Sequence, residues 1–169
     1  MTINRMINGQ EISVAPAVNV YPATEEDVPR LLYLGHLFNE ESGRQFDIDN
    51  EHWCRFWQQA IANDMGCAFY AATARHAHPV GMIMGIVYPS HIDQRLEVTE
   101  SLWYLSKPYR RARTGIELLD ALECFAELIG ASRINMTHLA NPHGRRIHRL
   151  FERRGYVAAE CSYYKEVNQ

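Results

Sequence analysis

The sequence predicts a mixed α/β (α+β) fold in which one sheet is covered by helices on both faces. The 169 residues are 47% hydrophobic and 22% charged, which are the size and balance of one compact domain with a substantial core. The hydrophobic periodicity gives the order strand, two helices, three strands, helix, strand, helix, strand. Strands interleaved with helices in this way form layered structures, because each apolar face must be buried against another element.

The chain is expected to consist of an N-terminal arm and one domain. Residues 1–16 are typical of an irregular arm or a short edge strand, with a turn at Asn8-Gly9. Residues 17–169 contain no repeat, low-complexity segment or linker, so we expect them to form a single domain.

The domain opens with a strand and two helices. Residues 18–21 alternate as a strand does, and Thr24 then offers an N-cap hydroxyl with Asp27 at the N3 position of a leucine-rich helix. After a polar stretch, the aspartates within residues 47–49 can start a second helix, which ends near Gly66. Its apolar residues are expected to share one side of the helix, namely Trp53, Phe56, Trp57 and Ile61.

Three strands form the middle of the domain. Residues 67–74 and 80–88 are apolar runs joined by a short polar link, which is typical of an antiparallel hairpin. Residues 96–105 continue the sheet with an alternating pattern. We expect one face of this strand to carry Val98, Glu100, Leu102 and Tyr104.

The last third of the chain supplies the strongest helix and the end of the sheet. Residues 115–129 have apolar positions spaced for one helix face, with Gly130 just after them. Residues 133–136 form a short strand, Asn141-Pro142 opens another helix, and the chain returns to extended structure from Tyr156 onward.

Charge and cysteine content exclude several classes of protein. The formal net charge of −3 argues against a general nucleic-acid binder, because such proteins carry a basic excess over a whole face. We expect neither secretion nor membrane spanning, because the N-terminus lacks an apolar signal-peptide core and no apolar run is long enough. The four cysteines have no C-x-x-C pair and lie in apolar stretches, which indicates reduced, buried thiols and a cytoplasmic location: Cys54, Cys67, Cys124 and Cys161.

A cluster of arginines precedes the strongest helix, in the segment KPYRRARTGIELL at residues 107–119. The first turn of a helix has unpaired backbone N–H groups and the positive end of the dipole, so it attracts anions. Cations there are unfavourable by about a few tenths of a kcal/mol each, unless an anion is bound. A phosphate or pyrophosphate flanked by these arginines would explain the cluster. A solvated basic loop, paired with acidic residues of the same helix, explains the charges alone equally well.

The same region resembles the GNAT acetyltransferase family in the segment ESLWYLSKPYRRARTGIELLDALECFAELIGASRINM, residues 100–136. In that family a strand ends in a loop of pattern [RQ]-x-x-G-x-[GA], which grips the pyrophosphate of acetyl-coenzyme A. The segment VYPATEEDVPRLLYL resembles the family's opening strand and helix, and RLFERRGYVAAECSYYKEV resembles its closing helix and strands. The resemblance implies a GNAT-like fold with a central, mostly antiparallel sheet over nearly the whole chain from Val18.

Details of the sequence resemble a prokaryotic and phage-borne branch of the family, in the elements F-N-E-E-S, Y-P-S-H and E-S-L-W-Y.

The sequence also departs from the family pattern. Arg113 replaces the first motif glycine and would either crowd the pyrophosphate loop or contact a phosphate directly. Phe151 stands where the family often has a tyrosine, and Gly144 where it often has an asparagine. Asn141 is nearby, either as a cofactor contact or as the N-cap ahead of Pro142.

The resemblance implies a set of residues for acetyl-coenzyme A, with no metal. They are Trp103, Tyr104, Leu105, Arg110, Arg111, Ala112, Arg113, Thr114, Gly115, Ile116 and Asn141. The carbonyl oxygen of the thioester would be stabilised by a backbone N–H around Tyr104 or Leu105. Three tyrosines offer phenols that could protonate the leaving thiolate, and the spacing does not choose among Tyr104, Tyr163 and Tyr164.

Glu100 is the candidate general base. It lies mid-strand on a largely apolar face, close to where the family's thioester is bound, and partial burial would raise its pKa toward a useful range. The alternative is a structural carboxylate that pairs with an arginine or accepts a bond from a backbone group.

The sequence therefore predicts an N-acetyltransferase that transfers an acetyl group from acetyl-coenzyme A to a primary amine of a small molecule or a protein. One alternative is a protein of the same fold that binds an acyl-coenzyme A without turnover. Another is a module that binds phosphate or nucleic acid through the arginines. The acceptor could meet Phe38, Glu40, Glu41 and Ser42, although a solvated loop explains these residues equally well. Monomer and homodimer both remain open.

Overall fold

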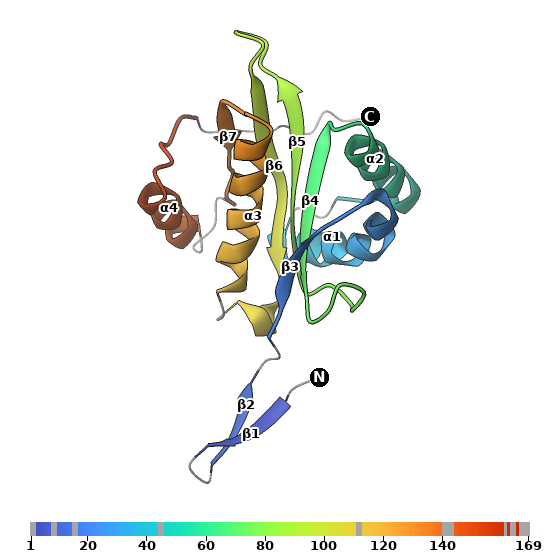
Figure 1. The fold of residues 1–169 in the computed structure, drawn as a ribbon, viewed down its shortest axis with the longest axis vertical. Helices are drawn as coiled ribbons and strands as arrows, with labels where there is room; N and C mark the ends of the chain where they lie inside the picture. Colours follow the sequence, from blue (N-terminus) through green and yellow to red (C-terminus); the bar gives the residue numbers. More distant parts are fainter. Residues whose placement is uncertain are drawn as a thin grey trace. The chain divides into compact units, whose positions relative to one another are not determined.

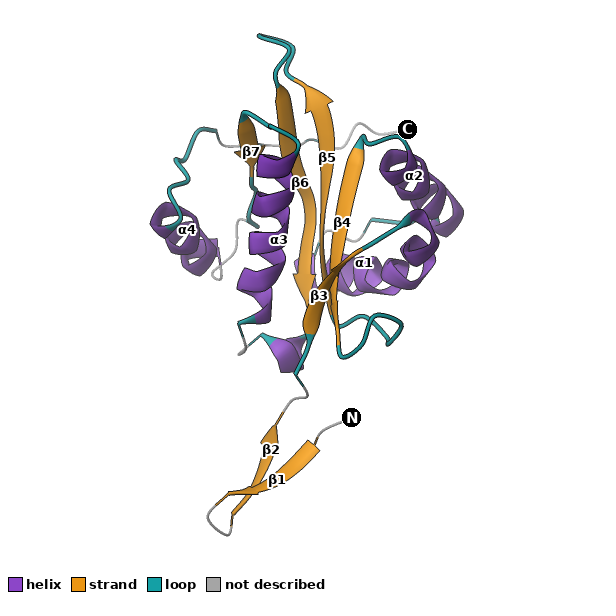
Figure 2. Cartoon of the chain, viewed as in Figure 1, coloured by secondary structure: helices purple, strands orange, loops and turns teal. Residues whose placement is uncertain are grey.

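The structure is a computed structural model that describes residues 3–7, 10–14, 17–43, 46–110, 113–139, 144–160, 162 and 165. Contacts within the chain divide it into two compact units, residues 1–137 and 138–169, and each is described by itself. The first unit contains a five-stranded sheet and a separate two-stranded sheet (Figures 1 and 2). The single domain expected over residues 17–169 stays a prediction.

The N-terminal segment forms a β-hairpin. Strand β1 (Ile3–Ile7) pairs antiparallel with β2 (Gln10–Val14). The segment is therefore a two-stranded hairpin, which differs from the irregular arm or short edge strand that we expected. The turn expected at Asn8-Gly9 lies outside the described residues.

The five-stranded sheet has the order β3-β4-β5-β6-β7. Every neighbouring pair is antiparallel except β6 and β7, which are parallel. The predicted mixed, mostly antiparallel sheet is therefore confirmed. Its strands are β3 (Asn19–Pro22), β4 (Gly66–Ala72), β5 (Gly81–Pro89), β6 (Leu96–Leu105) and β7 (Arg133–Asn135). The helices of this unit are α1 (Val28–Ser42), α2 (Asn50–Ala62) and α3 (Thr114–Leu128).

The helix boundaries follow from their capping residues. The backbone N–H and hydroxyl of Thr24 both donate to Oδ2 of Asp27, at 3.0 and 3.2 Å, and one short 3-10 turn leads into α1. Asp49 caps α2 by accepting a 2.9 Å bond from the backbone N–H of His52. Helix α3 ends at Leu128, and Gly130, two residues later, has a left-handed φ of 70°. These start and stop signals were all present in the sequence.

Helices cover both faces of the sheet (Figure 1). Residues of α1 and α2 form a core with alternate residues of β4, β5 and β6. The intervening residues face α3, as the 6.0 Å contact between the rings of Phe69 and Phe125 shows. The expected apolar side of α2 is corrected at Phe56, which is 46% exposed whereas Trp57 is 5% exposed. Adjacent residues on a helix are about 100° apart, so both cannot face the core.

The described part of the second unit contains helix α4 (Gly144–Arg153). Phe151 is buried, and its ring packs 5.3 Å from that of Tyr156. The strand expected from Tyr156 onward is not formed by residues 156–160, and Asn141-Pro142 lies outside the described residues. In the part of the chain that the structure describes, no helix is long and apolar enough to span a membrane.

Candidate functional site

Strand β6 contains a β-bulge near its centre. Glu100 pairs with Gly85 and Leu102 pairs with Met84, so Ser101 between them has no partner in β5. An extra residue of this kind interrupts the alternation of side chains and bends the strand. Bulges of this type frequently lie beside active sites.

The bulge corrects the predicted face of this strand. Leu102 and Tyr104 belong to the core beneath α1 and α2, whereas Val98 and Glu100 pair with residues of β5 that point to the opposite face. Strict alternation would have placed all four side chains on one face. No periodicity in the sequence reveals the extra residue at Ser101.

Strands β6 and β7 separate next to this bulge. Their parallel pairing runs only from Glu97 and Arg133 to Thr99 and Asn135. For residues 100–105, no strand in the described part of the chain pairs with this edge of β6. Backbone N–H groups on this edge are therefore not used by the sheet, and such groups can bind a ligand's oxygen.

Glu100 lies where the two strands separate. Its carboxylate Oε2 accepts a 2.8 Å bond from the hydroxyl of Thr137 and a 3.3 Å bond from the backbone N–H of the same residue. Glu100 is only 6% exposed. The backbone contact matches the structural alternative, and sequence reasoning missed Thr137 because nothing marks it in the sequence.

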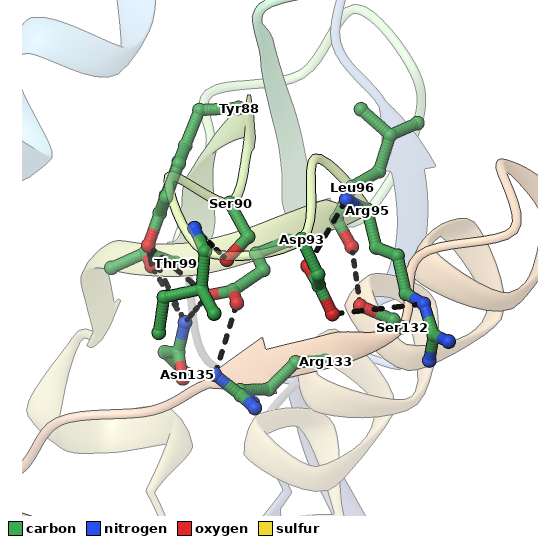
Figure 3. A network of polar contacts seen from close by, with 11 residues as sticks. Tyr88, Ser90, Asp93, Arg95, Leu96, Thr99, Ser132, Arg133 and Asn135 are labelled. Atoms are coloured by element: carbon green, nitrogen blue, oxygen red, sulfur yellow. Dashed lines mark hydrogen bonds and ion pairs between the residues drawn. The ribbon is translucent and has the colours of Figure 1, made fainter.

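A second buried carboxylate, Glu97, connects β5, β6 and β7 close to the point where β6 and β7 separate. It accepts a 3.0 Å bond from Nη1 of Arg133 and a 2.9 Å bond from Nδ2 of Asn135. Figure 3 shows Asn135 beside Tyr88 and Thr99, whose hydroxyls lie 3.0 Å apart. The Asn135 hydrogen bond is the largest of several contacts that lower the pKa of Glu97 against the effect of burial. The network holds β5, β6 and β7 in register, and no spacing in the sequence indicates it.

At the other end of β6, one carboxylate joins α1 to the arginine loop. Glu41 accepts a 2.6 Å bond from the phenol of Tyr104 and a 2.7 Å bond from Nη2 of Arg110. Nζ of Lys107 lies 3.8 Å from the same carboxylate. Nε of Arg110 also donates a 2.6 Å bond to the carbonyl of Leu105. Part of the positive charge of this loop is therefore balanced by Glu41.

These contacts change the pKa values of both partners. Burial acts to raise the pKa of Glu41, but the hydrogen bonds from Tyr104 and Arg110 and the nearby cationic charges outweigh it, so the pKa lies below its usual value. Burial and the Glu41 carboxylate raise the pKa of Tyr104 to about 12. Glu41 is thus held ionised, and Tyr104 is a poor proton donor at neutral pH.

The start of α3 follows this loop. Gly115 lies against the strand, because a Cβ atom there would meet Leu105 Cδ2 at 3.7 Å and Trp103 Cζ2 at 3.9 Å. The side chain of Arg113 is exposed and forms no ion pair with a described carboxylate. Among described residues, none accepts a bond from the backbone N–H of Thr114 or Gly115. These donors fit an anionic group.

The structure thus brings together part of the predicted site. Tyr104, Arg110 and Leu105 are linked by hydrogen bonds, directly or through Glu41, while Trp103 and Leu105 support the start of α3. Thr114 is buried and Ile116 half-buried in the same helix. The predicted residues Arg111, Ala112 and Asn141 lie outside the described residues, as do Tyr163 and Tyr164.

Three of the four cysteines lie within the described residues. The three described cysteines are free, with Cys67 buried and Cys124 exposed, so the expectation of a buried thiol is wrong for Cys124. Cys161 lies outside the described residues. No group of three or more histidine, cysteine, aspartate or glutamate side chains that could hold a metal ion occurs among the residues that the structure describes.

Known structures share this fold at low sequence identity. An aminoglycoside acetyltransferase from an uncultured soil metagenomic sample, in complex with trehalose, is 17% identical, with 90% of this chain and 96% of that chain covered and a TM-score of 0.69. A predicted acetyltransferase from Clostridium acetobutylicum, with acetyl-coenzyme A, is 16% identical over 90% and 96% of the two chains, with a TM-score of 0.70. A ribosomal-protein-alanine N-acetyltransferase from Brucella melitensis is 16% identical over 90% and 100%, with a TM-score of 0.67.

Sequence comparison identifies the family. No curated protein sequence matches the chain. The sequence profile of the acetyltransferase (GNAT) family, however, matches residues 31–156, which include the bulge, the arginine loop and the start of α3. The chain therefore belongs to the acetyltransferase (GNAT) family, whose enzymes transfer an acetyl group from acetyl-coenzyme A.

Proposed function

We propose that this chain is an N-acetyltransferase whose acceptor is a primary amine on a small molecule or a protein, with Glu100 as the general base. The observation that carries the proposal is the position of Glu100. Its carboxylate is buried beside the bulge of β6 and is held by Thr137 where β6 and β7 separate. Acetyl transfer to an amine needs a group that accepts a proton, and a carboxylate beside the open edge of β6 is suited to that role.

The base is needed because the acceptor must lose a proton. A lysine-like amine has a pKa of about 10.4 and is mostly protonated at neutral pH, so it is not a nucleophile until its proton is removed. Glu100 would take this proton directly or through a water molecule. Thr137 positions the carboxylate by donating to one oxygen, Oε2.

Residues at the start of α3 are proposed to hold the coenzyme, which supplies an acetyl thioester when it is bound. The backbone N–H groups of Thr114 and Gly115 and the exposed side chain of Arg113 are suited to the diphosphate. Arg110 has five N–H donors, and two are used by Leu105 and Glu41. Three donors therefore remain for a phosphate oxygen.

Release of the coenzyme thiolate does not require a strong acid from the protein. A thiol has a pKa of about 8.5, so the thiolate is a tolerable leaving group. The pKa of Tyr104, about 12, makes its phenol a weaker acid than a thiol. We therefore assign Tyr104 a positioning role through Glu41 and infer that solvent protonates the thiolate.

The acceptor is proposed to bind near the end of α1 and to place its amine in the opening between β6 and β7, where the carboxylate of Glu100 lies. Glu41 is engaged by Tyr104 and Arg110, which leaves the exposed Glu40 as the better candidate to attract a cationic amine. A structure with similar fold is an aminoglycoside acetyltransferase in complex with sisomicin. This likeness supports a small-molecule amine as the first class to test.

The chain is further proposed to be cytoplasmic and to belong to the prokaryotic and phage-borne branch.

The test is release of free coenzyme A from acetyl-coenzyme A in the presence of a panel of amines, including an aminoglycoside and a lysine-containing peptide. Chromatographic detection is needed because Cys124 is exposed and would react with thiol reagents. We expect turnover with at least one amine, and a loss of about 10²–10⁴-fold in kcat for Glu100→Gln, without loss of coenzyme binding. The matched control is Glu127→Gln, an exposed carboxylate of α3.

Two results would contradict this function. Coenzyme binding without turnover on any amine would identify a non-catalytic member of the fold. Full activity in Glu100→Gln would exclude Glu100 as the base and leave the family assignment unaffected.

A further inference from the structure

Helix α4 carries an unusual concentration of positive charge. Residues 145–154 contain five arginines and one glutamate, a net charge of +4 (5 − 1), although the whole chain has a net charge of −3. Repulsion between arginines that are close together opposes folding of the helix. A bound anion would remove this repulsion.

Four of these arginines lie on one side of the helix. At about 100° per residue, Arg145, Arg146, Arg149 and Arg153 fall within an arc of about 100°. Their side chains are exposed, and none forms an ion pair with a carboxylate among the residues that the structure describes. The nearby carboxylate, Glu152, lies 3.4 Å from Nε2 of His148 instead.

Two of the guanidinium groups are anchored to the helix backbone. Nε of Arg149 donates a 3.3 Å bond to the carbonyl of Arg145, and Nε of Arg153 donates a 3.1 Å bond to the carbonyl of Arg149. These bonds restrict the long side chains and leave both terminal nitrogens of each group available. Fixed guanidinium donors are the groups that bind phosphate best, because their planar fork matches two of its oxygens.

The arginines line a hollow on the surface. It has a volume of about 300 Å³ and is formed by Arg146, Arg149, Glu152 and Arg153. This volume is at the lower end of the range for small-molecule sites, about 300–1,000 Å³, and it exceeds what one inorganic anion fills. Three cationic groups beside one carboxylate suit a ligand that offers a phosphate to the arginines and a hydroxyl or amino donor to Glu152.

We propose that this hollow on α4 binds the phosphate monoester of a nucleotide or sugar phosphate. The phosphate carries a charge of about −1.5 to −2 at neutral pH, which matches the net charge of +2 on the four lining residues (three arginines and one glutamate). The hydroxyl or amino group of the attached sugar or base donates to Glu152. A nucleic-acid strand fits less well, because each of its phosphodiester groups carries a charge of about −1 and has two terminal oxygens, whereas a phosphate monoester has three. The site does not depend on the acetyl-transfer reaction.

The test is calorimetric titration of the full chain with adenosine 3′-monophosphate, with adenosine as the unphosphorylated control. We expect Arg149→Gln to weaken binding of the nucleotide about tenfold or more and adenosine to bind much more weakly than the nucleotide. Arg55→Gln, which removes one exposed cation from α2, should leave binding unchanged. Glutamine has nearly the helix propensity of arginine, and Arg153→Gln is a second variant if the first does not fold.

The role of Glu152 has its own readout. Inorganic phosphate has no sugar or base that could donate a hydrogen bond to Glu152. The natural chain should therefore bind the nucleotide more tightly than it binds inorganic phosphate. Glu152→Gln should reduce this preference while phosphate itself binds as well as before or better, because a negative charge is removed. An unchanged preference would overturn the part of the proposal that concerns Glu152.

The phosphate that binds in the hollow belongs either to the coenzyme or to a separate nucleotide. A comparison of coenzyme A with dephospho-coenzyme A distinguishes these two sources. If the coenzyme's 3′-phosphate occupies the hollow, Arg149→Gln and loss of that phosphate will have non-additive effects on affinity. If a separate nucleotide is the ligand, Arg149→Gln will leave coenzyme affinity unchanged, and adenosine 3′-monophosphate will still bind at saturating coenzyme. Either result supports a phosphomonoester site. The proposal is overturned if Arg149→Gln does not affect nucleotide binding, or if only oligonucleotides bind at α4.

Discussion

The phenol of Tyr104 on β6 donates a 2.6 Å hydrogen bond to the carboxylate of Glu41 on α1, a residue 63 positions earlier in the chain. The same carboxylate accepts from Arg110, which precedes α3. One side chain of α1 therefore links the strand that carries Glu100 to the loop proposed to hold the coenzyme. A substitution of Glu41 should therefore affect both Tyr104 on the strand and Arg110 in the loop.

The titration of Tyr104 tests this link. In Glu41→Gln, the carboxylate's negative charge no longer opposes ionisation of the phenol, so the pKa of Tyr104 should fall below its value of about 12, although burial keeps it above the usual 10.0. Nuclear magnetic resonance of the labelled tyrosine ring measures this directly. Glu40→Gln, one residue away and exposed, is the control. Identical titration curves for Tyr104 in both variants would show that Glu41 does not influence it.

Glu97 is expected to stabilise the fold in a pH-dependent way. Its pKa is lowered by the folded state, so its stabilising effect is fully present above its usual pKa of 4.5 and is lost as the pH falls through the lower, folded-state value. At pH 7, Glu97→Gln should lower the midpoint of thermal unfolding by about 2–4 °C or more. The difference from the natural chain should shrink in acid, where Glu97 itself is protonated.

The control for this measurement is Glu127→Gln, which alters an exposed carboxylate of α3. Its unfolding midpoint should stay close to that of the natural chain at both pH values. A Glu97→Gln midpoint that differs from the natural chain by the same amount at pH 3 and pH 7 would contradict a role for the ionised carboxylate.

Arg113 stands where the family motif has a glycine. Its side chain would either contact a phosphate of the coenzyme or crowd the loop that binds it. Its side chain is exposed and has no ion pair with a described carboxylate, which favours a contact with phosphate. Arg113→Ala should therefore weaken binding of acetyl-coenzyme A about tenfold, the loss of one charge-assisted hydrogen bond. Calorimetric titration measures this, with Arg95→Ala as the control at another exposed arginine. Tighter binding by Arg113→Ala would mean that Arg113 crowds the loop.

Local signals in the sequence predicted most of the fold. Thr24 and Asp49 mark helix starts and Gly130 marks a helix end, and each does so through its own backbone or side-chain chemistry. The hairpin of β4 and β5 follows from two apolar runs and a polar link. These features depend on residues close together in the chain, and a single sequence contains that information.

The contacts that build the site join residues far apart in the chain. Glu100 meets Thr137, and Glu41 meets Tyr104 and Arg110, yet no spacing rule connects these positions. The bulge at Ser101 has no glycine or other marker, so the alternating pattern assigned Glu100 and Tyr104 to one face. The sequence could identify which residues carry chemistry, but not which of them would meet.

The central claim is that acetyl-coenzyme A binds at the start of α3, and thermal unfolding with and without this ligand tests it most directly. At a hundredfold excess over its dissociation constant, the ligand should stabilise the native chain by about 2.7 kcal/mol. For a chain of this length that raises the unfolding midpoint by about 5–11 °C, and the rise should be smaller in Arg113→Ala at the same ligand concentration. An unfolding midpoint that does not change with acetyl-coenzyme A, even at millimolar concentration, would contradict the account.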